Sequence, residues 1–271
     1  MPSSKRERKR SKQERQQAYE AAARRRQRRR GRLMTGTVIV ATLGIGFVGI
    51  LAFATRESRD AEPDSDAVPA GSTTSTTGFD APCPEPDGSS PRQSSFRRAP
   101  RFCIDPDKDY KARMETDIGV FVIDLLEDDA PETVNNFVFL ARYHFLDHIP
   151  FHRVARGFVI QGGNPPGEGV IGPGYTFADE NVPRPPYTYQ VGDVMMAREV
   201  PNTNGSQYLL VTGAEAASLP LAYPLFGRIV EGMDVVMRID ADGGERQRSS
   251  DPPNFTPKVT HTVTRVTIIE S

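Results

Sequence analysis

The sequence contains no tryptophan and only two cysteines among its 271 residues. Two cysteines are too few for a disulfide-dense scaffold or for a zinc site with four thiolate ligands, so apolar packing must stabilise any folded core. Hydrophobic residues make up 37% of the chain and charged residues 25%, which excludes a fully disordered or collagen-like protein. We therefore expect one globular domain with additional segments.

Net charge is almost absent, yet the charges are distributed unevenly. The formal net charge is −1, but residues 1–32 contain 14 Lys and Arg against 3 Asp and Glu, so this segment carries +11 and the rest of the chain −12. A basic segment of this kind indicates nucleic acid or a membrane as its partner. Apart from Tyr19 no aromatic residue is interleaved with the arginines, and the later basic residues are scattered among acids, so we predict no nucleic-acid partner.

A long uncharged run follows the basic segment. Residues 33–55 are 23 residues without a charge, and a helix of that length spans about 35 Å, enough to cross a bilayer. The preceding arginines favour a cytoplasmic N-terminus, which predicts a single-pass protein of the cell membrane with an extracytoplasmic C-terminal domain. The alternative is a cleaved signal peptide, since Ala52-Phe53-Ala54 fits a cleavage site. The lengths of the basic and apolar segments favour the uncleaved anchor.

Residues 56–100 are rich in Pro, Ser, Thr, Asp and Gly and poor in large apolar side chains, which predicts a disordered linker. Residues 101–271 are then the folded domain. Cys83 and Cys103 lie near the end of this linker, and the predicted topology places them in an oxidising compartment. We expect them to form a disulfide, with two free thiols as the alternative.

The folded part has the pattern of an all-β domain with two helices. Alternating residues from Lys111 to Leu126, interrupted at Asp117-Ile118-Gly119, predict a β-hairpin. Residues 131–143 place apolar side chains at helical spacing after a proline, which predicts an amphipathic helix. Further strands are expected at 151–154, 158–161, 192–197, 207–212, 225–229 and 258–269, and a second helix at 233–239. Many short strands with only two helices favour a closed antiparallel barrel over βαβ units.

Four stretches have distinctive sequence motifs: FHRVARGFVIQGGNPPGEG from Phe151, GPGYTFADE from Gly172, PNTNGSQYLLVT from Pro201 and LFGRIVEGMDVV from Leu225. In this order and spacing they resemble cyclophilin-type peptidyl-prolyl cis-trans isomerases over about residues 114–269. The preceding stretch is similar to the leader of membrane-tethered cyclophilins from high-GC Gram-positive bacteria. The resemblance implies an eight-stranded barrel closed by two helices, with a proline-binding groove on its outer surface.

The resemblance also implies an activity and the residues that carry it. The enzyme would rotate X-Pro peptide bonds of extracytoplasmic polypeptides, with Arg153 as the donor to the prolyl nitrogen and Gln161 orienting Arg153 or holding the substrate backbone. The residues expected to bind substrate are Phe158, Val159, Ala197, Arg198, Gln207, Leu209, Leu219 and Tyr223. On a regular strand Phe158 would point away from Gln161, so a bulge near Gly157 is needed, and an ordinary core aromatic is the alternative.

No cofactor or metal is implied by this chemistry. His144, His148 and His152 recur every four residues, but Pro150 and the strand after it break the helical register, so we predict no metal site. The partners we expect are proline-containing polypeptides.

The chain departs from the family pattern in its pocket. Leu209 stands where an aromatic residue is usual, Ser218 where many members have Trp, Tyr223 where a His is frequent and Arg198 where an Asn binds peptide backbone. Because Arg153 and Gln161 are retained, catalysis is the favoured interpretation. The alternative is a non-catalytic module that binds proline-containing peptides as a chaperone or scaffold.

Overall fold

The computed structural model describes residues 81–166, 172–244 and 255–271. The predicted basic segment 1–32 and transmembrane segment 33–55 lie outside these residues, as does the first part of the predicted linker. Within the described ranges, no helix combines the length and the apolar character needed to cross a membrane. All described residues belong to one unit of the chain, residues 76–271.

The first two strands form the predicted hairpin. Strand β1 (Tyr110–Thr116) pairs with β2 (Gly119–Leu125) in antiparallel register. The alternating sequence places Tyr110, Ala112 and Met114 in the core, because successive side chains of a strand point to opposite faces.

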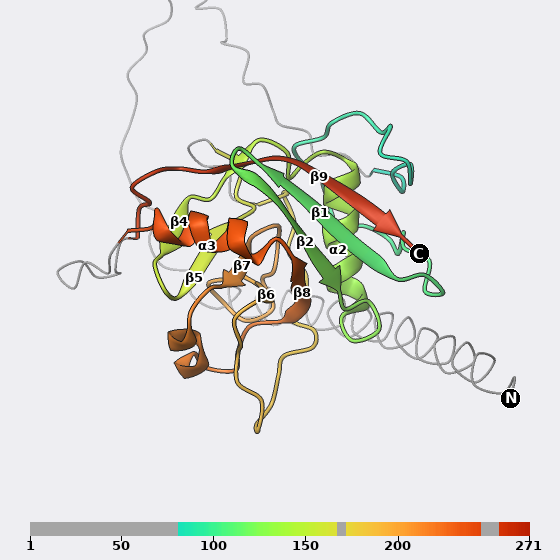
Figure 1. Cartoon of the computed structure of the whole chain (residues 1–271). Helices are drawn as coiled ribbons and strands as arrows, with labels where there is room; N and C mark the ends of the chain where they lie inside the picture. Colours follow the sequence, from blue (N-terminus) through green and yellow to red (C-terminus); the bar gives the residue numbers. More distant parts are fainter. Residues whose placement is uncertain (1–80, 167–171, 245–254) are drawn as a thin grey trace, which may run out of the picture. The chain divides into compact units, whose positions relative to one another are not determined.

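The remaining elements follow the expected order. Helix α2 (Pro131–Arg142) begins with a proline in its first turn, and α3 (Met233–Ala241) is the second α-helix. The other elements are β3 (Ile149–Pro150), β4 (Arg153–Ala155), β5 (Val159–Gly162), β6 (Asp193–Met196), β7 (Tyr208–Val211), the 3-10 helix η1 (Ala214–Ser218), β8 (Leu225–Glu231) and β9 (Thr262–Glu270). Helix α2 packs against β9, and α3 packs against β2, β4 and β5 (Figure 1).

The strands form one antiparallel sheet in the order β3-β9-β1-β2-β8-β6-β7-β5-β4. The all-β class with two α-helices is as predicted, but the closed eight-stranded barrel is not. The described residues form nine strands in a curled half-barrel, with β3 and β4 as its edges and no ladder between them.

Local sequence accounts for this open seam. Strand β3 is two residues long and ends in Pro150, which has no N–H to donate to a further strand. Irregular backbone covers the free edge of β4 instead. Val154 N–H donates to the Phe255 carbonyl at 3.0 Å, and Gly244 N–H donates to the Val154 carbonyl at 3.0 Å.

The strands β5, β6 and β7 carry apolar side chains on both faces. Ile160, Val194 and Leu210 belong to the main core inside the curled sheet. Val159 and Leu209 belong to a second apolar cluster on the opposite face. The strict alternation of side chains along each strand produces this division, and the second cluster provides an apolar base on the outer face of the sheet.

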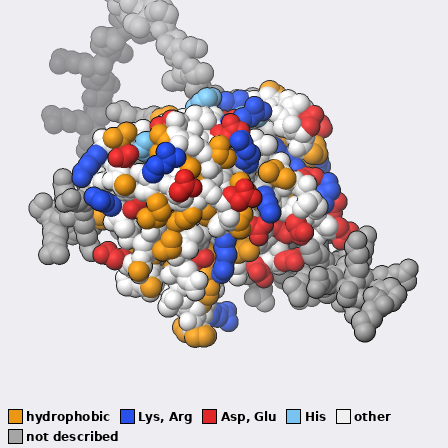
Figure 2. All heavy atoms as spheres, viewed as in Figure 1, with side chains coloured by type: hydrophobic (Ala, Val, Ile, Leu, Met, Phe, Trp, Pro, Cys, Tyr) orange, Lys and Arg blue, Asp and Glu red, His pale blue; other side chains and the backbone are white. Residues whose placement is uncertain are grey.

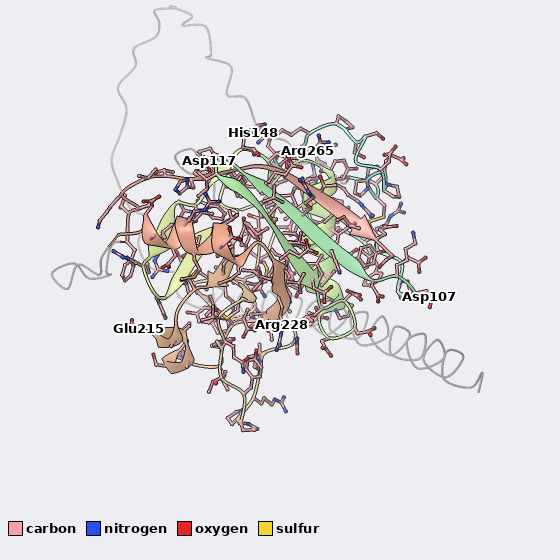
Figure 3. The ribbon with its side chains drawn as sticks, in the orientation of Figure 1. Asp107, Asp117, His148, Glu215, Arg228 and Arg265 are labelled. Atoms are coloured by element: carbon pink, nitrogen blue, oxygen red, sulfur yellow. A yellow bond between two sulfur atoms is a disulfide. The ribbon has the colours of Figure 1, made fainter. Side chains whose placement is uncertain are left out.

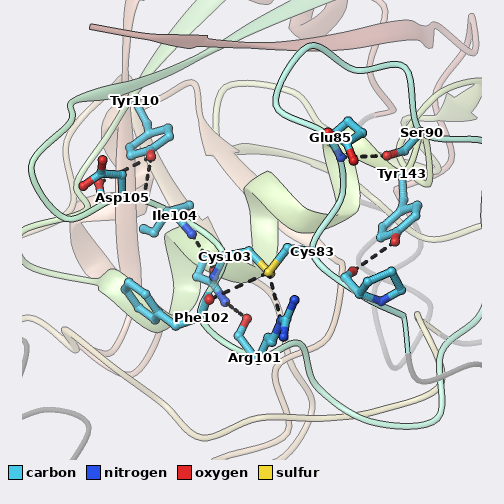
Figure 4. The surroundings of a disulfide bond; sticks show 12 residues. Cys83, Glu85, Ser90, Arg101, Phe102, Cys103, Ile104, Asp105, Tyr110 and Tyr143 are labelled. Atoms are coloured by element: carbon cyan, nitrogen blue, oxygen red, sulfur yellow. Dashed lines mark hydrogen bonds between the residues drawn. A yellow bond between two sulfur atoms is a disulfide. The ribbon is translucent and has the colours of Figure 1, made fainter.

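The N-terminal boundary of the domain differs from the expected one. Residues 81–104, here called the N-terminal strap, pack against the domain, although residues up to 100 were expected to be linker. Phe96 in the strap is 1% exposed and belongs to the main core. Cys83 and Cys103 form a disulfide that closes the strap into a loop (Figure 4). A composition poor in large apolar residues indicated disorder, but the buried Phe96, the disulfide and hydrogen bonds to the domain hold the segment in place.

Charged side chains are mixed over the face of the domain shown in Figure 2, where lysine and arginine alternate with aspartate and glutamate. On this face, the described residues form no continuous basic stripe of the kind that binds nucleic-acid phosphates. This distribution agrees with the scattered basic residues in the sequence of the folded part.

A buried histidine joins three elements at one end of the sheet. His261, just before β9, is 5% exposed. Its Nδ1 lies 2.8 Å from Asp117 Oδ2 in the β1–β2 turn, and its Nε2 lies 3.0 Å from Asp242 Oδ2 at the end of α3. Burial acts to lower the pKa of the imidazole, but the hydrogen bonds with Asp242 and Asp117 outweigh it and hold the pKa above its ordinary value.

This arrangement predicts a pH-dependent contribution to stability. Because the folded-state pKa of His261 is raised, its stabilising contribution is complete below the ordinary pKa and is lost as the pH rises through the folded-state pKa. We expect His261→Gln to lower the free energy of unfolding by about 1 kcal/mol in mildly acidic buffer and by less in alkaline buffer. Urea unfolding over a pH series measures both values. His148→Asn, at an exposed position (Figure 3), is the control, and an equal difference at every pH would contradict the prediction.

Candidate active site

A cavity of about 330 Å³ opens on the outer face of the sheet, above the second apolar cluster. Its lining includes most of the site residues that the sequence predicted. These are Arg153, Gln161, Ala197, Arg198, Gln207, Leu209 and Tyr223. The register of the sheet brings them together, since Gln161 of β5 and Met195 of β6 both pair with Leu209 of β7.

Arg153 and Gln161 face each other across the β4–β5 ladder. Arg153 Nη1 donates to Gln161 Oε1 at 3.3 Å, and Gln161 Nε2 donates to Gln207 Oε1 at 2.8 Å. Gln207 Nε2 in turn donates to Asn164 Oδ1 at 3.5 Å. A guanidinium and a row of amides therefore cross the cavity floor, and each amide fixes the orientation of the next.

A residue that the sequence analysis did not identify holds Arg153 from the other side. The guanidinium carbon of Arg153 lies 4.7 Å from the ring centroid of Phe255, which is 7% exposed. Burial lowers the pKa of the Arg153 guanidinium, while nearby Tyr223 acts in the opposite direction. Arginine keeps its proton at neutral pH despite such shifts, so the site presents a fixed positive charge.

The apolar part of the site lies beside this cation. Phe158, Val159 and Leu219 do not line the cavity but pack in the second apolar cluster with Leu209 and Tyr223. Phe158 reaches this face because it lies in the turn before β5 rather than in the strand.

The turn before β5 has the bulge-like geometry that this placement requires. Its Gly157 adopts a positive φ of 72°, and Phe158 N–H donates to the Ala155 carbonyl at 3.0 Å. A φ in this region favours glycine because it has no Cβ. Phe158 therefore packs against the second apolar cluster and is not part of the main core inside the curled sheet.

Arg198 lies in the cavity wall and makes two hydrogen bonds there. Its Nε donates to Asp179 Oδ1 at 2.6 Å, and its Nη2 donates to the Ala222 carbonyl at 2.5 Å. Its guanidinium carbon also lies 5.8 Å from the ring centroid of Tyr223. Arg198 therefore braces Tyr223 and the segment before β8.

Several further lining residues were not predicted. Tyr175, Glu199 and Thr203 line the cavity, and Asn164 joins the row of amides. Tyr175 and Thr203 lie within stretches quoted above for the resemblance, so their position in those stretches was the available signal. Phe255 lies outside those stretches, and no local pattern marked it.

Comparison with solved structures defines the class of fold. A cyclophilin-type peptidyl-prolyl cis-trans isomerase of Cryptosporidium parvum superposes with a TM-score of 0.50 and 25% sequence identity, covering 60% of this chain and 99% of the other. The curled sheet with an outer groove is thus a cyclophilin-like fold.

The sequence comparisons then identify the family. Residues 111–265 match the profile of the cyclophilin type peptidyl-prolyl cis-trans isomerase/CLD family, and the chain belongs to this family. A peptidyl-prolyl cis-trans isomerase of Arabidopsis thaliana is 35% identical over 152 residues, covering 55% of this chain and 90% of that protein. Peptidyl-prolyl cis-trans isomerase-like 1 of Rhizopus delemar is 41% identical over 129 residues, covering 46% of this chain and 77% of that protein.

Proposed function

We propose that this cyclophilin-type peptidyl-prolyl cis-trans isomerase acts on proline-containing polypeptides outside the cytoplasm, with the Arg153 guanidinium as the group that lowers the rotation barrier. A cyclophilin-type isomerase of Cryptosporidium parvum with 26% sequence identity has been crystallised in the presence of the dipeptide Ala-Pro. That precedent supports proline-containing peptides as ligands of the groove in this chain.

Rotation of a prolyl peptide bond requires only a positioned hydrogen-bond donor from the protein. Resonance gives the peptide C–N bond partial double-bond character and a barrier of about 18–20 kcal/mol. Rotation breaks this resonance and localises the lone pair on the prolyl nitrogen. A donor fixed beside that nitrogen stabilises the rotated state more than the planar one, and each ~1.4 kcal/mol of this difference accelerates rotation tenfold.

The observation that carries the proposal is how Arg153 is held. Within the described residues its side chain makes one hydrogen bond, to the Gln161 amide, and one stack, on the Phe255 ring. Neither partner carries a negative charge. Stacking on the face of the guanidinium also leaves the N–H groups at its edge free, because those donors point outward in the guanidinium plane. The cation is therefore oriented while its charge and donors stay available to a substrate.

We expect Arg153→Ala to lower the isomerisation rate by about 100-fold or more, the range seen when one transition-state donor is removed. Arg153→Lys keeps the positive charge but loses the planar guanidinium, so its rate should lie between those of wild type and Arg153→Ala. NMR exchange spectroscopy on a proline-containing tetrapeptide measures the rate without a coupled protease. The control is Arg156→Ala, in the neighbouring turn. Equal rates for Arg153→Ala and wild type would leave a non-catalytic peptide-binding module.

Phe255 has a separate prediction. We expect Phe255→Leu to lower the rate about threefold to tenfold, since it removes a partly buried cation–π contact while keeping an apolar side chain. The affinity for the peptide should change little, because leucine keeps an apolar side chain in the second apolar cluster, to which Phe255 and Leu209 both belong. Phe255→Tyr retains the aromatic face and should retain most of the rate. A Leu variant with the wild-type rate would show that the ring does not position Arg153.

The proposed location rests on the sequence and on the disulfide. Arginines precede the 23 uncharged residues 33–55, which favours a membrane anchor with a cytoplasmic N-terminus. The bond between Cys83 and Cys103 is typical of proteins outside the reducing cytoplasm. Both observations support a cell-membrane protein whose isomerase domain is extracytoplasmic, as in the membrane-tethered form that the sequence resembles.

This topology has a direct test on cells that express the full chain. We expect the protein to remain with the membrane fraction after alkaline extraction and its domain to be digested by protease added to spheroplasts. A cytoplasmic marker that stays intact is the control. A domain that resists the added protease would contradict the topology. A product whose intact mass matches residues 55–271 would show that a signal peptide is cleaved after Ala54.

A further inference from the structure

The N-terminal strap lies outside the part of the chain that matches the family profile, residues 111–265, and it supports the substrate groove from behind. Its contacts nevertheless reach into the matched domain, because Phe96 packs in the main core. Its contacts therefore indicate what it adds to this particular chain.

The strap is fastened to the domain along its length. The Cys83–Cys103 disulfide closes it at its ends, and Figure 4 shows Tyr143 of the domain beside it, its hydroxyl donating to the Pro82 carbonyl at 3.0 Å. Between these points Gln93 N–H donates to the Tyr143 carbonyl at 2.9 Å. The segment is thus held as a continuous layer.

Phe96 is the innermost residue of this layer. Its ring packs among Phe139, Tyr143, Phe145 and Tyr175, with centroid distances from 4.8 to 6.4 Å. Its backbone N–H donates to the Pro173 carbonyl at 2.8 Å. The strap therefore contacts residues 172–176 through both a side chain and a backbone hydrogen bond.

Residues 172–176 are one wall of the groove. Gly172, Pro173, Tyr175 and Thr176 line the cavity. Gly174 adopts a positive φ of 95°, and a Cβ at this position would come within 2.5 Å of the Phe96 carbonyl oxygen. The close approach of the two backbones leaves the wall no room to move towards the strap.

The same wall is connected to helix α2 and to Gly205, which lies beside Pro173 and Tyr175. Tyr175 hydroxyl donates to Asn136 Oδ1 at 2.6 Å, and Asn136 Nδ2 donates to the Gly205 carbonyl at 2.9 Å. Gly205 lines the cavity too. Asn136 of helix α2 therefore fixes Tyr175 and Gly205 next to each other, and Phe96 packs against the same Tyr175.

We propose that the strap is a specificity element of the isomerase, in which Phe96 positions the 172–176 wall to bind peptide residues flanking the proline, and the disulfide keeps Phe96 in place. This inference rests on the proposed function. Phe96 is a positioning residue, because it acts through Pro173 and Tyr175. Phe96 makes no described contact with Arg153 or with its partners Gln161 and Phe255. The strap should therefore affect the affinity for the peptide and not the turnover rate.

The test compares Phe96→Leu with wild type in the full chain. Its matched control is Phe145→Leu, the same change at a buried residue of the same aromatic group that makes no described contact with the wall. NMR titration gives the dissociation constants of the blocked tetrapeptide Ala-Ala-Pro-Phe and of the dipeptide Ala-Pro, and exchange spectroscopy gives the turnover rate.

For Phe96→Leu we expect about threefold to tenfold weaker binding of the tetrapeptide, unchanged binding of the dipeptide and a turnover rate at saturation within about twofold of wild type. With only one residue beside the proline, the dipeptide should fill the proline pocket without reaching the wall. Equal weakening in Phe145→Leu would show a general effect of destabilisation, and unchanged tetrapeptide binding in Phe96→Leu would show that the strap does not shape the groove. Either result overturns the inference.

A second measurement does not depend on a core substitution. Dithiothreitol reduces the Cys83–Cys103 bond to two thiols and is itself oxidised to a cyclic disulfide, so reductant should weaken tetrapeptide binding by wild type. The double variant Cys83→Ser/Cys103→Ser should bind as weakly without reductant and show no response to it. Loss of activity in Arg153→Ala tests the proposed function separately, since that variant leaves the strap intact. Tetrapeptide binding that is insensitive to reductant in wild type would overturn the role given to the disulfide.

Discussion

The proposed chemistry of this protein depends on a guanidinium that is held firmly without being neutralised. Carboxylates are the usual partners of a half-buried arginine, and they would occupy its donors. Here Gln161 accepts one hydrogen bond and Phe255 supplies an aromatic face, so Arg153 is oriented by two uncharged partners. A cation whose charge is not neutralised interacts more strongly with the lone pair of the rotated prolyl nitrogen than with the planar amide nitrogen. This difference lowers the barrier to rotation.

The sheet makes this site possible because three of its strands are apolar on both faces. One face of β5, β6 and β7 fills the main core, and the other supports the groove. The interior of the curled sheet is therefore free to be a packed core rather than a binding cavity. Substrate binding on the outer surface also leaves room for a long polypeptide, whose chain need not pass through the protein.

Segments outside the regular ladders complete the site. The backbone of Phe255 covers the free edge of β4 while its ring supports Arg153, and the N-terminal strap backs the wall that contains Tyr175. Both segments are poor in secondary structure. They use single aromatic residues, backbone hydrogen bonds and one disulfide to reach positions that strand pairing does not provide.

The amino-acid sequence by itself determined the local elements and seven of the residues that line the groove. The period of two in β1 and β2, the helical spacing in α2 and the motifs around Arg153 and Gln207 are properties of neighbouring residues. The ordering of residues 81–100 and the pairing of Arg153 with Phe255 were decided only by the tertiary structure. Each depends on contacts between residues that are far apart in the chain, and such contacts cannot be predicted from a local pattern in the sequence.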